Sequence, residues 1–101
     1  MISRGLIIAC IASFVLGCVG PAPYQEYTLS EAAMASAKAA NASLYSPGVW
    51  SQAEEAYFEA KKHFKEREYD DAAVKFEEAR RLAERAENIS RLKKFQSGES
   101  F

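Results

Sequence analysis

Apolar residues recur every three or four positions along most of the chain, which is the spacing of one face of an α-helix. Three segments show this period, residues 28–44, 47–67 and 70–95. Glycine and proline are scarce, 5 and 3 residues in the whole chain, and a fold of many strands needs frequent turn residues. The pattern therefore predicts an all-α fold, a small three-helix bundle over residues 28–95, with a flexible tail at residues 96–101.

The first predicted helix, Thr28–Leu44, has a face built almost wholly from small residues. The members of this face are Leu29, Ala32, Ala33, Ser36, Ala39, Ala40, Ser43 and Leu44. Small side chains bury little area but permit a close approach between helix axes, so we expect this helix to pack tightly against a larger element. Thr28 and Glu31 have capping-box spacing and predict where the helix begins.

The second and third predicted helices carry bulkier apolar residues and form a helical hairpin. Ser46 is the expected N-cap of the second helix, and Pro47 suits its first position. Acidic residues at Asp70 and Asp71 favour a new helix N-terminus after a turn around residues 66–70. The expected core positions are Val49, Trp50, Ala53, Ala56, Tyr57, Ala60 and Phe64, then Ala72, Ala73, Phe76, Ala79, Leu82, Ala83, Ala86, Ile89 and Leu92.

Charged residues cover the remaining faces of these helices. Three pairs in the third helix have an acid four residues before a base, an arrangement worth about 0.2–0.5 kcal/mol each. The pairs are Asp71 with Lys75, Glu77 with Arg81, and Glu87 with Arg91.

The beginning of the chain has a different character. Arg4 is the single charge in a short head, and Leu6–Leu16 follows as eleven uncharged, mostly apolar residues. This is the layout of a secretory signal peptide. Even when it is extended to Gly20, the uncharged run from Leu6 has fifteen residues, and a membrane-spanning helix needs about 20. We therefore expect residues 1–17 to be a removable leader.

The end of this apolar run, Val15-Leu16-Gly17-Cys18, resembles the bacterial lipobox. The resemblance implies that the Cys18 thiol receives a diacylglyceryl group and that, after cleavage, its amine receives an acyl chain such as palmitate. More than one chain gives stable anchoring. Val19, which follows the cysteine, resembles the outer-membrane sorting signal and implies a protein facing the periplasm. An ordinary secretory signal that happens to contain a cysteine is the alternative.

The cysteine content agrees with a lipid anchor. Cys10 would leave with the leader and Cys18 would be consumed by lipid, so no disulfide, thiol catalyst or cysteine metal site would remain. We expect residues 18–27 to form a tether that holds the domain away from the headgroups. This segment includes Gly20-Pro21-Ala22-Pro23.

The mature chain resembles a family of short bacterial envelope lipoproteins that contain a helical domain of unknown function. The resemblance is carried by the alanine-rich first segment, by Tyr45-Ser46-Pro47, by the Trp50, Ala53 and Ala56 spacing, and by the alanines of the third segment. It implies an envelope location and a helical shape, and it brings no catalytic residues. The hairpin is also similar to a single tetratricopeptide repeat, with Tyr69-x-x-Ala72 at the start of its second helix.

Candidate chemistry is sparse, and we expect no enzyme. His63, the only histidine, has Glu59 one turn earlier, but a metal site needs three or four ligands and none is expected here. Adjacent acidic pairs such as Glu77-Glu78 diverge by about 100° on a helix and form no catalytic dyad. The net charge is -1 and no basic stripe is present, which disfavours nucleic-acid binding. Arg91, Lys93 and Lys94 are expected to complement the helix dipole, with phospholipid or peptidoglycan contact as the alternative.

Exposed aromatic residues are the remaining candidates for a binding site. Tyr57 and Phe58 are adjacent and cannot face the same partner, so Phe58 is expected to be exposed and, with Phe95, to contact another protein. The predicted function is a lipid-anchored, non-enzymatic binding or scaffolding module with an envelope protein or peptidoglycan as its partner. The alternative is self-association through the Ala/Ser face of the first helix; the sequence leaves the oligomeric state open.

Overall fold

We analysed the fold in a computed structural model, which describes residues 21–98. Its helices in chain order are α2 (Tyr24–Ala39), α3 (Ala42–Tyr45), α4 (Pro47–Lys65) and α5 (Tyr69–Gln96). The described residues contain no β-strand, so the predicted all-α fold class is confirmed. The expected leader at residues 1–17 and the expected lipid attachment at Cys18 lie outside the described residues.

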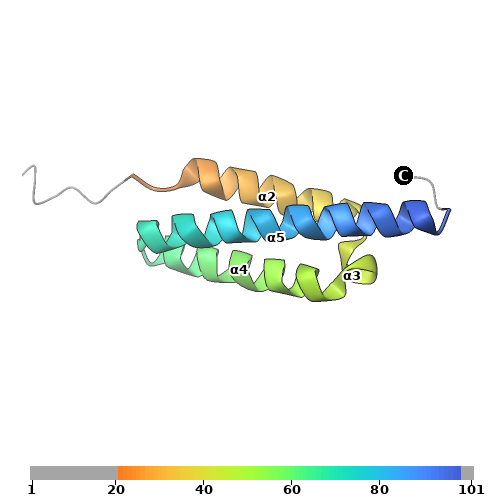
Figure 1. The fold of residues 1–101 in the computed structure, drawn as a ribbon. Helices are drawn as coiled ribbons and strands as arrows, with labels where there is room; N and C mark the ends of the chain where they lie inside the picture. The colour runs from red at the N-terminus through yellow and green to blue at the C-terminus, as the bar shows by residue number, and fades with distance from the viewer. Residues whose placement is uncertain (1–20, 99–101) are drawn as a thin grey trace, which may run out of the picture.

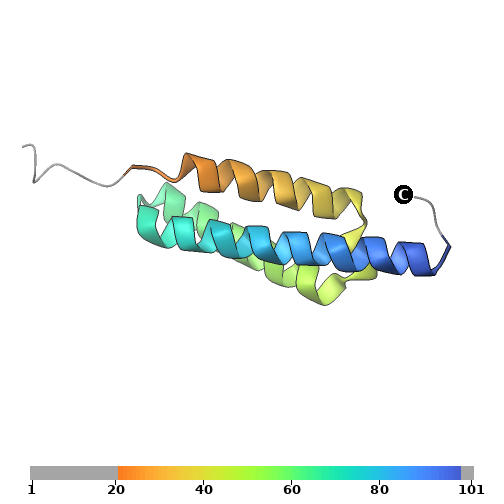
Figure 2. The ribbon, with the colours of Figure 1, turned by 45° about the horizontal axis from the view of Figure 1, so that its top comes forward.

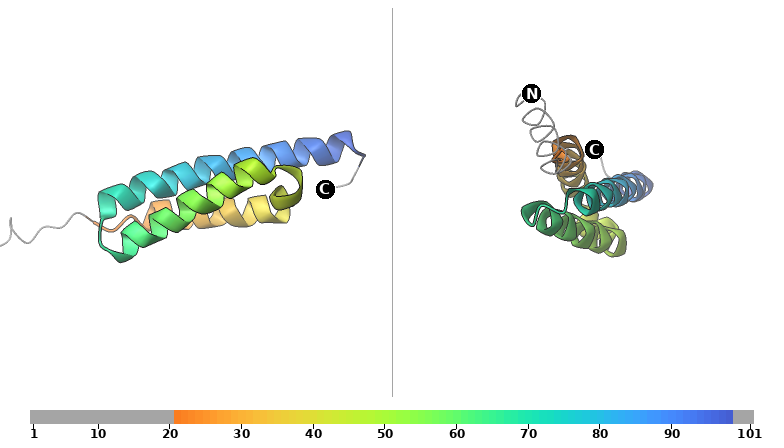
Figure 3. Two further views of the ribbon diagram at one scale, coloured as in Figure 1. Left: turned by 90° about the horizontal axis from the view of Figure 1, so that it is seen from below. Right: turned by 90° about the vertical axis from the view of Figure 1, so that its left-hand side faces the viewer.

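The three long helices lie side by side, and α5 is the element that both of the others contact most (Figures 1 and 2). Helix α4 runs antiparallel to α5, whereas α2 runs in the same direction as α5 (Figure 3). The start of α2 therefore lies at the same end of the bundle as the turn between α4 and α5. We call this end the turn end, and the opposite end, which holds α3, the α3 end.

Helix α2 begins earlier than the sequence predicts. It starts at Tyr24, directly after Pro23, rather than at Thr28, and the expected capping box is wrong. Thr28 lies inside the helix, where its hydroxyl donates a hydrogen bond to the Tyr24 carbonyl at 2.9 Å. Because a proline cannot continue a helix toward the N-terminus but fits its edge, Pro23 sets the boundary. The last four residues of the expected tether, 24–27, are helical.

The same helix also ends earlier than expected. The predicted segment 28–44 is interrupted after Ala39, and Asn41 adopts a left-handed conformation with φ 60°. Asparagine tolerates this conformation better than most residues. The chain then forms the single turn α3 and reaches α4 with Pro47 at its first position, as predicted.

The inward face of α2 differs from the predicted one. Leu29 and Leu44 are 47% and 70% exposed, and Ala32, Ser36, Ala39 and Ser43 are exposed as well. The residues that do turn inward are Tyr27, Ser30, Met34 and Ala37, together with Ala33 and Ala40. The bulky residues determine which side of α2 faces the core, because Tyr27 and Met34 bury more apolar area than any alanine in the segment.

The predicted hairpin of α4 and α5 is present, but α4 ends at Lys65 rather than at residue 67, and α5 covers Tyr69–Gln96 rather than residues 70–95. The turn falls at residues 66–68, where Arg67 has φ 61°, and α5 starts with Asp70 and Asp71 in its first turn. The expected core positions are buried or half-buried, with Leu92 as the exception at 57% exposed.

Ion pairs follow the three-dimensional packing more than the sequence spacing. The expected pair of Glu87 and Arg91 forms at 3.3 Å. The expected pair of Asp71 and Lys75 is wrong, because the Lys75 ammonium lies 3.2 Å from Glu59 of α4 and 3.1 Å from Glu78. Glu77 likewise pairs with Arg80 at 3.5 Å rather than with Arg81.

Two clusters of buried residues form the core. The alanine cluster, near the α3 end, consists of Ala37, Ala42, Ala53, Ala83 and Ala86, with Trp50 and Met34 packed against it. The aromatic cluster, near the turn end, consists of Phe76, Ala60 and Ala72, with Tyr27, Tyr57 and Phe64 packed against them. Phe76, at the turn end, is the largest fully buried side chain of the described residues, whereas the buried members of the alanine cluster are all alanines.

Candidate functional site

A groove between α2 and α4 lies beside the aromatic cluster. It has a volume of about 570 Å³ and is lined by Tyr27 of α2 and by Phe58, Lys61, Lys62, Phe64 and Lys65 of α4. Residues 58, 61, 62 and 65 share one side of α4 because they are three, four and seven positions apart. We call this feature the lysine–aromatic groove.

The wall of the groove is made of aromatic rings in mutual contact. The ring of Phe64 lies 5.3 Å from that of Tyr27 and 5.6 Å from that of Tyr24, both edge to face. Tyr27 also contacts Tyr57 at 6.3 Å. Burial, with a smaller contribution from neighbouring Tyr27, raises the pKa of the Tyr57 phenol to about 12. These contacts fix the wall and join it to the first turn of α2.

The rim of the groove is basic. The Lys61 ammonium lies 4.6 Å from the centre of the Tyr57 ring, within cation–π range. Among the described residues, no carboxylate forms an ion pair with Lys61, Lys62 or Lys65. Phe58, on the same rim, is 68% exposed, as predicted. The groove therefore combines an apolar floor with three ammonium groups that lack an acidic partner in this part of the structure.

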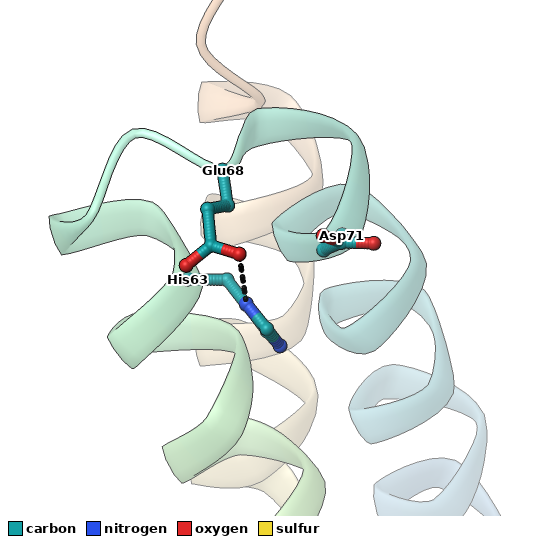
Figure 4. A group of neighbouring side chains, drawn as sticks. All are labelled: His63, Glu68 and Asp71. Carbon is teal, nitrogen blue, oxygen red and sulfur yellow. Dashed lines mark ion pairs between the residues drawn. The ribbon is translucent and has the colours of Figure 1, made fainter.

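The adjacent turn carries charge of the opposite sign. His63, Glu68 and Asp71 each place a potential ligand atom within 4.8 Å of the others (Figure 4). The His63 Nδ1 atom is 3.5 Å from a Glu68 carboxylate oxygen, yet it forms no hydrogen bond within residues 21–98. The side-chain hydrogen bond between Glu68 and Glu66 favours the protonated Glu68 carboxyl, and it is the main cause that raises the pKa of this carboxyl above its ordinary value.

This acidic turn brings together more potential ligands than the sequence predicted. Glu59, one turn before His63, binds Lys75 of α5 at 3.2 Å. The turn at Arg67 folds Glu68 and Asp71 back toward His63, a proximity that no helical spacing reveals. Both carboxylates are exposed, and Asp71 lies in the first turn of α5, where the helix dipole favours an acid. That role accounts for Asp71.

At the α3 end, the basic residues have specific partners. The Lys93 ammonium donates to the Tyr45 carbonyl, the last carbonyl of α3, at 2.6 Å. The Lys94 side chain is buried, with its ammonium 5.7 Å from the Tyr45 ring centre. The expected role of these lysines at the α5 dipole is therefore refined, because they hold α3 against α5.

The two predicted contact residues, Phe58 and Phe95, are both exposed but lie at opposite ends of the bundle. Phe95 is 71% exposed and sits at the α3 end, where Leu44 and Leu92 are also exposed. The exposure of Phe58 was predicted from the sequence, whereas the role of the three lysines beside it was not. Their spacing relative to Phe58 was the available signal.

Comparison of the chain with protein-family models, with curated proteins and with solved structures finds no match in any of the three. Over residues 21–98, none of the helices has both the length and the apolar character that crossing a membrane requires.

Proposed function

We propose that the protein is a lipid-anchored module of the bacterial envelope that binds or scaffolds another component and performs no chemistry of its own. The carrying observation is the lipobox-like Val15–Cys18 segment, which lies six residues before the start of α2. The likeness to short envelope lipoproteins, drawn from Trp50 and the alanine spacing, supports the same location, the periplasmic side of the outer membrane.

The layout of the bundle supports a scaffolding role. An anchor at Cys18 would attach to the turn end, because the chain enters α2 there. The three long helices, packed side by side, would then extend from the membrane and carry the α3 end away from it. Phe95, Leu92 and Leu44 are exposed at that distal end, which suits contact with an envelope protein or with peptidoglycan.

The anchor is tested by mass spectrometry of the mature N-terminus and by metabolic labelling with palmitate. We expect a chain that begins at an acylated Cys18, and a Cys18→Ser variant that incorporates no label. A mature chain that still contains Arg4, with no label, would overturn the anchor.

The distal contact is tested by a photo-crosslinking residue at position 95 in intact cells. We expect a discrete adduct with a protein or with peptidoglycan fragments, and a much weaker one from the matched exposed position Thr28 on α2. Equal adducts from the two positions would show that the α3 end has no preferred partner.

Self-association is the second candidate, and the exposure of the small-residue face of α2 favours it. Leu29, Ala32, Ser36 and Ala39 face outward, so a second copy could pack against them. Sedimentation of the mature protein in detergent should then show a dimer that Ala32→Arg converts to a monomer. A monomer for the parent protein over a wide concentration range would remove this candidate.

A further inference from the structure

We propose that the lysine–aromatic groove binds the phosphate of an anionic phospholipid in the same bilayer that holds the anchor. This inference rests on the proposed lipid anchor. It assigns the groove, with Phe58 on its rim, to the membrane rather than to a protein partner.

The first argument is the reach of the chain. Tyr24 is six positions after Cys18, and a fully extended chain covers at most about 3.6 Å per residue, so the reach from Cys18 to the start of α2 is at most about 22 Å. Tyr24 contacts Phe64, and Phe64 lines the groove. A lipid on Cys18 therefore keeps the groove close to the headgroups of its own leaflet.

The second argument is the chemistry of the groove. Lys61, Lys62 and Lys65 surround an apolar floor, and no described carboxylate neutralises them. Anionic headgroups attract such lysines over about one Debye length. Phe58 and Tyr24 are 68% and 69% exposed at the same end, and aromatic side chains suit the boundary between headgroups and acyl chains.

The third argument is the division of charge at the turn end. Glu68 and Asp71 lie at the turn between α4 and α5, whereas the three lysines face the side of α4 toward α2. An anionic surface attracts one side and repels the other. The groove side would therefore face the bilayer and the acidic turn would remain in water, which gives the bundle a fixed orientation.

The test uses the mature, lipid-bearing protein in vesicles and a tryptophan reporter. The double variant Phe58→Trp/Trp50→Phe moves the single tryptophan of the chain to the rim of the groove, and the parent protein, whose Trp50 packs at the alanine cluster, is the reference. Brominated lipids quench a tryptophan that reaches them. We expect quenching of the double variant in vesicles that contain phosphatidylglycerol, little in pure phosphatidylcholine, and little for the parent protein in either.

Matched charge variants separate the groove from net charge. Replacing Lys61, Lys62 and Lys65 by glutamine in the reporter should reduce the groove-bound population about fivefold per lysine and remove the quenching. The control replaces Lys38, Arg81 and Arg85, three exposed basic residues elsewhere, and should keep it. Equal loss in both triple variants, or quenching that ignores lipid charge, would overturn the proposal.

The other occupants of the groove have their own signatures. A spectral shift of the reporter that rises with protein concentration in neutral detergent would assign the groove to a second copy. A reporter that no lipid quenches while the protein floats with the vesicles would leave the groove to a protein partner. Either result overturns the proposal but keeps the anchor. A mature protein that carries no N-terminal lipid overturns the proposed function itself, and phosphatidylglycerol-dependent quenching in that protein would still support the groove.

Discussion

The cores at the two ends of this bundle are built from side chains of different size. At the turn end, Tyr27, Tyr57, Phe64 and Phe76 fill the space between α2, α4 and α5, with ring centres 4.6–6.3 Å apart among them. At the α3 end, alanines are the fully buried members of the core, and Met34, Val49, Trp50 and Leu82 pack against them half-buried.

This difference determines what each end can offer. Large rings fill a wide gap between helices, and the gap that they leave at the surface is the lysine–aromatic groove. Alanines bring helix backbones close together and leave little room for a ligand. The turn end carries the lysine–aromatic groove, whereas the α3 end has exposed apolar side chains such as Phe95 and Leu44.

The largest effect should come from the centre of the aromatic cluster. Phe76→Ala should lower the free energy of unfolding by about 3–5 kcal/mol, because a fully buried ring is replaced by a cavity. Phe76→Leu should give a smaller, measurable loss if the alanine variant does not fold. Urea denaturation followed by circular dichroism measures both. Phe58→Ala, at an exposed ring of the same end, is the control and should change the free energy of unfolding by less than about 0.5 kcal/mol. Equal losses at the two positions would show that burial of the Phe76 ring does not stabilise this end.

The alanine cluster should respond to the reverse change. Ala83→Leu adds volume where α5 meets the other helices and should cost about 1–3 kcal/mol. Ala39→Leu, on the exposed side of α2, is the matched control and should be nearly neutral. If denaturation shows that Ala83→Leu is tolerated as well as Ala39→Leu, then the α3 end is loosely packed and the contrast with the turn end fails.

The sequence predicted the fold class and the hairpin, because these depend on periodicity. Val49 to Phe64 and Ala72 to Ile89 repeat at helical spacing, and Pro47 marks the start of α4. The phase of α2 was mispredicted because alanine and serine stripes occur on more than one side of that helix. Only the position of Tyr27 against Phe64 and Phe76, a tertiary contact, decides between them.

The candidate site was predictable only in part. The exposure of Phe58 follows from its adjacency to Tyr57 on a helix. The groove needs a second wall from α2, and the acidic turn needs the left-handed Arg67 to fold Glu68 back, so both depend on contacts between elements. Such contacts carry no signal in local spacing.

Removing the buried serine hydroxyls near the alanine cluster should lower the free energy of unfolding by a smaller amount. Ser46, the expected N-cap of α4, makes no capping hydrogen bond; its hydroxyl instead donates to the Ala86 carbonyl at 2.9 Å and lies 2.8 Å from the Ser90 hydroxyl. The Ser90 hydroxyl lies 2.7 Å from the same carbonyl, but each hydroxyl has one proton, so Ser90 donates to the Ser46 oxygen when Ser46 donates to the carbonyl. This arrangement joins the chain before α4 to α5, and a buried hydroxyl needs such partners.

We expect Ser46→Ala and Ser90→Ala each to cost about 1 kcal/mol, the typical net value of a hydrogen bond. The double variant should lose less than the sum, because each single variant already removes the hydrogen bond between the two hydroxyls. Urea denaturation of the parent protein, the two single variants and the double variant completes this double-mutant cycle. Ser43→Ala, on the exposed side of α3, is the control. Strict additivity would mean that the two hydroxyls act independently.

The smallest effect is a titration confined to the aromatic end. Burial raises the pKa of the Tyr57 phenol to about 12 from 10.0, so the folded state holds this proton more tightly than the unfolded state between these pH values. The contribution of Tyr57 to stability is therefore complete below pH 10 and is lost as the pH rises toward 12. Phenolate absorbance measured against pH should show a separate step at high pH, with an amplitude of about one fifth of the total for the five tyrosines. Tyr57→Phe should remove this step, whereas Tyr24→Phe, at an exposed ring, should lower the total amplitude and leave the late step in place. A late step that survives in Tyr57→Phe would show that another tyrosine has the raised pKa, and it would contradict the assignment of the raised pKa to Tyr57.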